Sequence, residues 1–286
     1  MILIYGGKGF IGNYIVSELN KHNILCKLSS KRIYKYDNII DDINEYKPTH
    51  IISAAGFSTP TNIDYYEYNV ENLILTNTIG NLILADLTKR YNIHLTLIMS
   101  GCIYAYTNND YYNNIYYEND IPNFYGSTYS ANRIATEYFL INYTNVCILR
   151  LRMPISNDMD TKSLITKIVN YRTIINIPNS MSVLEDVIPF ISIVIDKNLT
   201  GVYNLVNNGI ITHPEILDLY KLYVNPYYKY TIISEEEQNK KLYALRSNCH
   251  ISNSKVSQYI KLPHIKQSVT NIFIQMKKVI DKYNLF

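Results

Sequence analysis

Short apolar runs alternate with amphipathic segments along the first half of the chain. The segments between the runs have helical spacing, most clearly over 11–21 and 70–91, and the runs themselves cover residues 1–5, 24–28, 49–55, 95–99 and 146–152. A short apolar run is typical of a buried strand, whereas apolar positions three and four apart favour a helix. This alternation predicts an α/β protein with a Rossmann-type, doubly wound parallel sheet.

After residue 152 the alternation becomes less regular, and no linker, repeat or low-complexity block appears. We expect helices over 164–171, 183–195, from 213 onward and over 266–283, and strands over 173–177 and 201–206. This pattern predicts a small C-terminal substrate-binding lobe, packed over the strand ends. The nucleotide-binding domain would comprise 1–152 with about 183–208, and the lobe 153–182 with 209–286.

Composition and charge exclude several classes of function. The net charge of +3 over 286 residues is too small to indicate nucleic-acid binding. No apolar run is long enough to span a membrane. The four cysteines (Cys26, Cys102, Cys147 and Cys249) are scattered without a Cys-x-x-Cys pair, so neither a disulfide framework nor a metal site is expected. We therefore expect a reduced, cytoplasmic protein.

A glycine loop follows the first apolar run directly and opens a helical segment. Its pattern is Gly6-x-x-Gly9-x-x-Gly12. A strand, a glycine loop and a helix in this order form a phosphate cradle, because the loop backbone approaches a pyrophosphate and the helix N-terminus faces the anion. The residues expected at a dinucleotide are Gly6, Gly7, Gly9, Phe10, Ile11 and Gly12.

The loop after the second run contains Lys31 and Arg32 and no acidic residue. In a dinucleotide fold an acid there binds the ribose 2′-hydroxyl, whereas a basic residue accommodates a 2′-phosphate. We therefore expect NADP(H), with NADPH preferred over NADH; an ordinary solvated loop is the alternative.

Within the helix over 70–91, Asn77 and Gly80 are poor helix formers, which indicates a packing or functional role.

The stretch from 99 to 133 concentrates groups that can handle protons or charge. Ser100 and Cys102 lie two residues apart at the end of a strand and so can face the same side. Tyr129 and Arg133 lie one helical turn apart and share a helix face. Alone, this pattern also fits a buried strand end beside an amphipathic helix.

The residues above stand in strings that resemble the extended short-chain dehydrogenase/reductase family over nearly the whole chain. Within it, the strings are most similar to the bifunctional 3,5-epimerase/4-reductases that convert UDP-4-keto-6-deoxy-D-glucose to UDP-L-rhamnose. The dTDP-4-dehydrorhamnose reductases and GDP-fucose synthases match fewer strings. The matching strings are YGGKGFIG, KPTHIISAAG, SGCIY, ENDIPNFYGSTYS, NVCILRLRMPIS, NIPNSMSVLEDVIP and GVYNLVNNGIITHPEI.

The resemblance implies catalytic roles for five residues. Tyr129 would protonate the C4 oxygen as hydride arrives, and Ser100 would hydrogen-bond the same oxygen. Arg133 stands where the family has the Lys that holds the nicotinamide ribose, and a rigid guanidinium is not equivalent to a Lys. Cys102 would exchange protons at C3 and C5, with Lys167 of the string ITK as its acid–base partner.

The resemblance also implies binding residues and partners. Asp42 and Ile43 would lie near the adenine, and Ala54, Ala55, Gly56 and Asn77 along the dinucleotide. The expected partners are a nucleotide-sugar substrate, a separate upstream 4,6-dehydratase, downstream glycosyltransferases and a second copy in a homodimer. The residues expected at the nucleotide sugar, besides Ser100 and Cys102, are Asn123, Asn179, Ser180, Met181 and Arg246.

Two alternatives remain open at this stage. The chain could be a 4-reductase alone, acting on a UDP or dTDP sugar that is already epimerised, although Cys102 and Lys167 favour the bifunctional activity. It could also be a non-catalytic NADP-binding sensor or scaffold, because Arg133 breaks the usual Tyr-x-x-x-Lys pattern.

Overall fold

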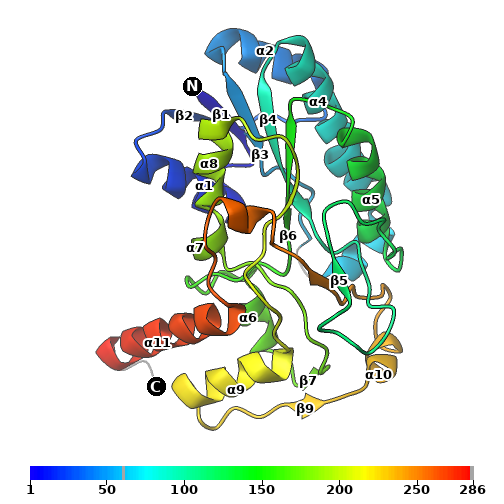
Figure 1. Ribbon diagram of the computed structural model, residues 1–286, viewed down its shortest axis with the longest axis vertical. Coiled ribbons are helices and arrows are strands. Elements are labelled where there is room, and N and C mark those ends of the chain that lie inside the picture. Colours follow the sequence, from blue (N-terminus) through cyan, green and yellow to red (C-terminus); the bar gives the residue numbers. More distant parts are fainter. Residues whose placement is uncertain (60–61, 284–286) are drawn as a thin grey trace.

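The computed structural model describes residues 1–59 and 62–283. A six-stranded sheet, in which every neighbouring pair of strands is parallel, forms its centre (Figure 1). The predicted Rossmann-type, doubly wound sheet is confirmed. In spatial order its strands are β2 (Cys26–Ser29), β1 (Ile2–Tyr5), β3 (His50–Ser53), β4 (His94–Ser100), β6 (Val146–Leu151) and β8 (Gly201–Asn204).

Helices cover both faces of the sheet, and each face has its own apolar core. Along β1, Ile2 and Ile4 face one core, whereas Leu3 and Tyr5 face the other. Because successive side chains of a strand alternate between faces, a strand buried on both sides has a continuous apolar sequence. This explains why the sheet could be recognised from apolar runs.

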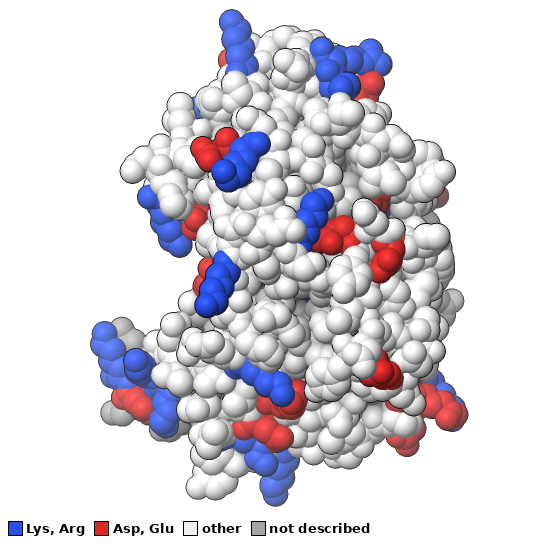
Figure 2. Space-filling model, in the orientation of Figure 1, with Lys and Arg blue, Asp and Glu red and all other residues white. Residues whose placement is uncertain are grey.

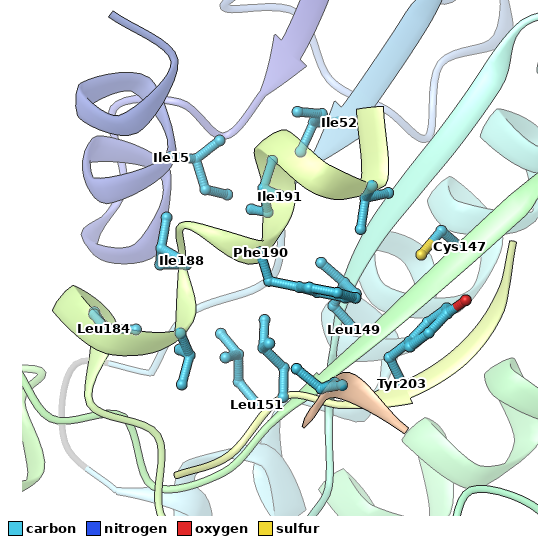
Figure 3. Packing of buried hydrophobic residues seen from close by; sticks show 14 of the residues in the cluster. Ile15, Ile52, Cys147, Leu149, Leu151, Leu184, Ile188, Phe190, Ile191 and Tyr203 are labelled. Carbon is cyan, nitrogen blue, oxygen red and sulfur yellow. The ribbon is translucent and has the colours of Figure 1, made fainter. Parts of the chain in front are cut away.

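The first core lies under α1 (Phe10–Lys21), α7 (Leu184–Val187) and α8 (Phe190–Lys197). Figure 3 shows Ile15, Ile191 and Phe190 from these helices in one cluster with Leu149 of β6. The second core lies under three helices on the opposite face (Figure 1). These are α2 (Tyr36–Tyr46), α4 (Gly80–Arg90) and α5 (Thr128–Leu140).

The order of the strands fixes where a ligand can bind. The chain runs from β1 outward to β2 and then returns to β3 on the other side of β1. The loops after β1 and β3 therefore diverge over opposite faces, and parallel sheets bind ligands in the crevice at such a point. The glycine loop follows β1, and Ala54-Ala55-Gly56 follows β3.

The helix predicted over 70–91 forms, but a π-helical segment interrupts it. It comprises α3 (Val70–Leu73), the π-helical η2 (Ile74–Ile79) and α4. Asn77 is fully buried in η2, and its Oδ1 accepts a hydrogen bond from the backbone N of Phe57 at 2.8 Å. A side chain at Gly80 would collide with Ile33. Both unfavourable helix residues are thus explained by contacts.

Other predicted elements differ in length from the observed ones. The helix predicted over 183–195 is instead α7 and α8, with Pro189 between them, because proline interrupts helical hydrogen bonding. The helix predicted over 164–171 is only α6 (Leu164–Ile168), and the strand over 173–177 is only β7 (Thr173–Ile174). The last helix agrees closely with prediction, as α11 (Ile265–Tyr283).

The C-terminal part adds a third apolar core beyond one end of the sheet (Figure 1). This core comprises residues of α6, α9 (His213–Tyr223) and α11. The predicted domain boundaries stay a prediction. The remaining short elements are η1 (Ile63–Tyr68), β5 (Ile115–Tyr116), β9 (Thr231–Ile232), α10 (Glu235–Asn239), β10 (His250–Ile251) and η3 (Val256–Gln258).

One face of the molecule has mixed charge. Figure 2 shows Lys and Arg interspersed with Asp and Glu on one face, which is hollowed above α11. Of the helices in the described part of the chain, none combines the length and apolar character needed to cross a membrane. All four cysteines are free thiols.

A buried ion pair joins β6 to α5, and its loss should lower the free energy of unfolding. The Nε of Arg150 donates to Glu137 at 3.0 Å, and its Nη1 donates to Tyr104 and Asn204. Glu137→Gln leaves the buried guanidinium without its counter-ion, which typically costs about 3–5 kcal/mol. Urea denaturation should show this loss, whereas Asp86→Asn, at the exposed pair with Arg90, should change the midpoint little. A Glu137→Gln protein with wild-type stability would contradict this account.

Candidate active site

The glycine loop has the close contacts that a phosphate cradle requires. Gly6 has φ of +72°, and a Cβ on it would lie 2.5 Å from the backbone N of Ala55, so the loops after β1 and β3 nearly touch. A Cβ on Gly12 would lie 2.1 Å from the carbonyl oxygen of Gly6. Gly9 is the N-cap of α1 and offers no capping side chain, which leaves the first-turn amides of the helix directed at this space.

A cavity of about 660 Å³ opens over this loop. Its basic residues are Lys8, Lys31, Arg32 and Lys162, and the part of the wall that the structure describes contains no carboxylate. This combination suits a bound dinucleotide phosphate. The predicted cofactor residues on the wall are Gly6, Gly7, Gly9, Phe10, Ile11, Lys31, Arg32, Ala54, Ala55 and Gly56.

Asp42 and Ile43 lie behind this wall. Asp42 is buried and accepts hydrogen bonds from Tyr5 Oη at 2.9 Å and Ser29 Oγ at 2.5 Å. Lys31 Nζ lies 3.1 Å from Asp42 Oδ1. Ile43 packs in the second core. The side chain of Asp42 thus ties together β1, β2 and the loop after β2, and neither residue lines the cavity. Gly12 and Asn77 likewise support the wall from behind.

Ser100 and Cys102 lie together at the end of β4. Ser100 is 7% exposed, and its Oγ accepts a hydrogen bond from the backbone N of Cys102 at 3.1 Å. The Cys102 carbonyl accepts one from Ser130 Oγ at 2.7 Å, which joins this turn to the start of α5. The turn that contains Ser100 and Cys102 is therefore joined through its backbone to the helix that contains Tyr129.

The ring of Tyr129 contacts two other side chains. The ring of Tyr66 stacks on it at a centroid distance of 5.2 Å, and the guanidinium carbon of Arg133 lies 5.1 Å from its centroid. Burial, with a contribution from Tyr129, raises the pKa of Tyr66 to about 12, so Tyr66 stays protonated. These contacts fix the orientation of the phenol.

Arg133 is directed from α5 toward the cofactor cavity. It is 9% exposed, its Nη1 lies 3.5 Å from Met99 Sδ, and its Nη2 lies beside Gly56, a wall residue. In the described part of the chain no carboxylate lies within ion-pair distance of Arg133. The guanidinium therefore lies beside the wall of the cavity over the glycine loop, without a described carboxylate as its partner.

Lys167 lies in α6 and faces a different cavity. This space of about 350 Å³ is also lined by Asn62, Thr161, Thr166, Asn170 and Tyr171. Burial and the charge of Lys162 lower the pKa of the Lys167 amine. The residue hydrogen-bonded to the Cys102 sulfur is instead Arg152, whose Nη1 lies 3.6 Å from it.

Three of the residues expected at the substrate lie inside the protein. Asn179 is 1% exposed and Ser180 and Met181 are fully buried. Asn179 binds Arg152, Ser180 binds the backbone of Ile251, and Met181 packs in the third core. Their backbone is buried as well, so the structure does not place these three residues at a surface that a substrate can reach. Asn123 is exposed, and its side chain bridges both backbone groups of Ala105.

Arg246 lies on the wall of a third cavity, of about 240 Å³, between the β4–α5 connection and the C-terminal lobe. Its Nη1 pairs with Asp64 Oδ1 at 2.9 Å. Although burial opposes ionisation, hydrogen bonds from Arg246 and the Ala244 backbone hold the pKa of Asp64 below its usual value. The polar residues around Arg246 include Asn108, Asn109, Glu235, Asn239 and Asn248.

Sequence reasoning missed the segment η1, which joins these parts. Tyr66 stacks on Tyr129, Glu67 accepts a hydrogen bond from the Thr128 backbone N at 2.7 Å, and Asp64 holds Arg246. No motif in the sequence identifies these contacts, because each partner is far away along the chain. Among the described residues, no group of three or more His, Cys, Asp or Glu side chains could hold a metal.

Comparison with known proteins decides the family. A model of the NAD dependent epimerase/dehydratase family matches residues 2–175, more than half of the chain. The chain belongs to this family. The family's name agrees with the cavity over the glycine loop, and the resemblance to extended short-chain dehydrogenases/reductases is confirmed.

Particular members of the epimerase/dehydratase family are similar over nearly the whole chain. A bifunctional dTDP-4-dehydrorhamnose 3,5-epimerase/reductase of Arabidopsis thaliana is 36% identical over 96% of this chain and 93% of its own length. A trifunctional UDP-glucose 4,6-dehydratase/3,5-epimerase/reductase of the same plant is also 36% identical, but the chain spans only 40% of its length. The crystal structure of the UDP-rhamnose synthase from Acanthamoeba polyphaga mimivirus is 32% identical, with a TM-score of 0.92 over 96% of this chain and 99% of that one.

Proposed function

We propose that this protein epimerises UDP-4-keto-6-deoxy-D-glucose at C3 and C5 and then reduces C4 with NADPH, giving UDP-L-rhamnose. The observation that supports this most is that Ser100 and Cys102 lie together at the end of β4, in a turn bound to Ser130, the residue after Tyr129 on α5. One turn further along the same helix, Arg133 lies beside Gly56, on the wall of the cavity over the glycine loop. The relatives named above, which combine epimerase and reductase in their names, support the same assignment.

The reduction needs a hydride donor and a proton donor on one carbonyl. When bound, the nicotinamide cofactor supplies hydride to C4. Tyr129 donates its phenolic proton to the C4 oxygen, and Ser100 hydrogen-bonds that oxygen as charge develops on it. Arg133, over the Tyr129 ring and beside Gly56, holds the ribose and stabilises the tyrosinate that is left.

The epimerisation needs no cofactor chemistry. The C4 ketone acidifies the protons at C3 and C5. The Cys102 thiolate removes one proton, the electron pair passes into the C4 enolate, and an acid returns a proton to the opposite face. Lys167, whose buried amine loses its proton more readily than usual, is the acid–base partner we propose. Because reduction destroys the ketone, both inversions precede hydride transfer.

We also propose that NADPH is preferred over NADH. The support is the wall near the end of β2, where Lys31 and Arg32 lie and where the described residues include no acid. The Asp42 carboxylate is already bound to Tyr5, Ser29 and Lys31, so it is not available to a ribose 2′-hydroxyl. Within this pair Arg32 carries more of the preference, since Lys31 is partly neutralised by Asp41 and Asp42.

Replacing both Lys31 and Arg32 with Ala should therefore change cofactor choice. We expect kcat/KM for NADPH to fall about tenfold to a hundredfold, as is typical when one or two charge-assisted phosphate contacts are lost. The value for NADH should stay nearly unchanged. Steady-state kinetics with both cofactors measures this. Lys27→Ala, on β2 outside the cavity, is the matched control. An unaltered NADPH/NADH ratio in the double variant would refute the assignment.

The names of the relatives support a proposal for the metabolic partners. The trifunctional plant proteins join a 4,6-dehydratase to the part that this chain matches. We propose that a 4,6-dehydratase supplies the keto sugar and that glycosyltransferases use the product. A homodimer stays a prediction.

The experiment that tests the proposal is incubation of the purified protein with NADPH and UDP-4-keto-6-deoxy-D-glucose, with dTDP-4-keto-6-deoxy-D-glucose in parallel. Oxidation of NADPH together with a product that co-elutes with UDP-L-rhamnose supports it. Formation of a 6-deoxy sugar with unchanged C3 and C5 would leave a 4-reductase only. Binding of NADPH without turnover of either sugar would favour the sensor alternative, and Arg133→Lys would then be the variant to examine for recovered activity.

A further inference from the structure

Arg152 follows β6 and is one of the largest fully buried side chains, at 0% exposure. Its Nη1 donates to Ser247 Oγ at 2.9 Å, and its Nη2 donates to the Ser247 carbonyl at 2.8 Å and to Asn179 Oδ1. Its Nη1 also donates to Cys102 Sγ at 3.6 Å. Its Nε is buried and has no hydrogen-bond partner. The guanidinium is therefore fixed against the sulfur by neutral groups only.

A buried cation without a nearby negative charge destabilises the folded state, so Arg152 is expected to have a negatively charged partner. In the described part of the chain no carboxylate lies within 4.0 Å of it. The buried cation next to it on β6, Arg150, differs in having Glu137 as its counter-ion. The acid nearest along the hydrogen-bond network is Glu235, beyond the amides of Asn179 and Asn248.

The titratable groups that surround Arg152 stay uncharged at neutral pH. Burial raises the pKa of Cys249 to about 11, although Arg152 opposes this. Burial also raises the pKa of Tyr106. Burial, together with the charge of Arg152, lowers the pKa of His213 to about 4, so this imidazole is neutral as well. None of the three supplies negative charge to Arg152.

We propose that Arg152 is a positioning residue whose guanidinium holds the Cys102 sulfur as a thiolate, ready to take a proton from C3 or C5 of the sugar. This role rests on the function proposed above. In the step, the thiolate becomes a thiol, the C–H electron pair enters the enolate, and the thiol later returns its proton to solvent. Asn179 and Ser247, buried and bound to Arg152, aim the guanidinium. Asn179 stands in the string NIPNSMSVLEDVIP, which the chain shares with the family, and in this proposal it acts on the base indirectly, through Arg152.

The test measures the ionisation of Cys102 without any substrate. Iodoacetamide reacts with thiolates, so the ratio of Cys102 alkylation rates at about pH 6.5 and about pH 9.5 reports the thiolate fraction independently of access. Mass spectrometry separates the Cys102 peptide from that of Cys26, which serves as the internal control. We expect the ratio to fall about tenfold or more in Arg152→Gln and to recover in part in Arg152→Lys, which keeps the charge. The Cys26 ratio should not change.

A second variant keeps the test valid if Arg152→Gln does not fold. In Asn179→Asp the new side chain has nearly the same shape as Asn but places a carboxylate next to the Arg152 guanidinium. This carboxylate neutralises the guanidinium, which then stabilises a thiolate at Cys102 less. The Cys102 ratio should again fall about tenfold, with Arg152 still in place. An ordinary thiol profile in the wild type, or an unchanged ratio in folded Asn179→Asp, overturns the proposal. Solvent exchange at C3 and C5, measured separately, distinguishes this failure from a failure of the epimerase assignment.

Discussion

Replacing Cys102 with Ala is expected to abolish deuterium exchange at C3 and C5 of UDP-4-keto-6-deoxy-D-glucose in D2O. Removing a positioned acid–base group typically costs about 10²–10⁴-fold. The turn itself should survive, because Cys102 is only partly buried and its backbone groups bind Ser100 and Ser130 whatever the side chain. Some loss of stability is expected, because the buried guanidinium of Arg152 loses its contact with the sulfur. Proton NMR of the sugar, with the cofactor omitted so that reduction cannot occur, measures the exchange directly.

The control for this variant is reduction of a sugar that needs no epimerisation. UDP-4-keto-L-rhamnose should be reduced by Cys102→Ala at close to the wild-type rate, because Ser100, Tyr129 and the cofactor cavity are unchanged. Cys147→Ala, at a buried thiol on β6 that faces the first core, is the matched cysteine control and should keep exchange. Exchange at both positions in Cys102→Ala would show that another group is the base.

The second large effect is expected from Tyr129→Phe, which should slow reduction of C4 by about 10²–10⁴-fold by removing the proton donor. Because a Phe ring can still stack on Tyr66 and lie under Arg133, the geometry should be kept. Cofactor binding should therefore persist, and NADPH oxidation with UDP-4-keto-L-rhamnose measures the loss.

Exchange at C3 and C5 should continue in Tyr129→Phe. Cys102→Ala should therefore lose epimerisation and keep reduction, whereas Tyr129→Phe should lose reduction and keep exchange. Tyr138→Phe, at an exposed ring on the same helix, is the control and should reduce normally. Full reduction by Tyr129→Phe would mean that the proton comes from elsewhere.

The fold could be predicted from sequence because its signals are local. Strands buried on both faces give apolar runs, and the glycine loop marks the end of the first strand. Boundaries were less predictable where one residue decides them, as Pro189 does between α7 and α8. The π-helical turn at Asn77 was visible only as an unfavourable residue, since its hydrogen bond to Phe57 joins segments twenty positions apart.

The site was harder to predict because its supporting contacts are distant in sequence. Lys31 was recognised as basic, but its pairing with Asp42 depends on how α2 packs. Arg150 and Arg152 stood in an apolar run, where two charges are unusual, and that was the available signal for buried partners. The neighbouring sequence does not show that Arg150 pairs with Glu137 and that Arg152 contacts Cys102. Resemblance placed Asn179 at the substrate, whereas packing places it behind Arg152.

The proposed activity can be tested in one experiment, the complete reaction in D2O with UDP-4-keto-6-deoxy-D-glucose and NADPH, followed by NMR. We expect UDP-L-rhamnose with deuterium at C3 and C5, protium at C4 from the cofactor, and one NADPH oxidised for each sugar formed. A reduced sugar that keeps protium and the original configuration at C3 and C5 would contradict it, because the same site would then reduce without epimerising.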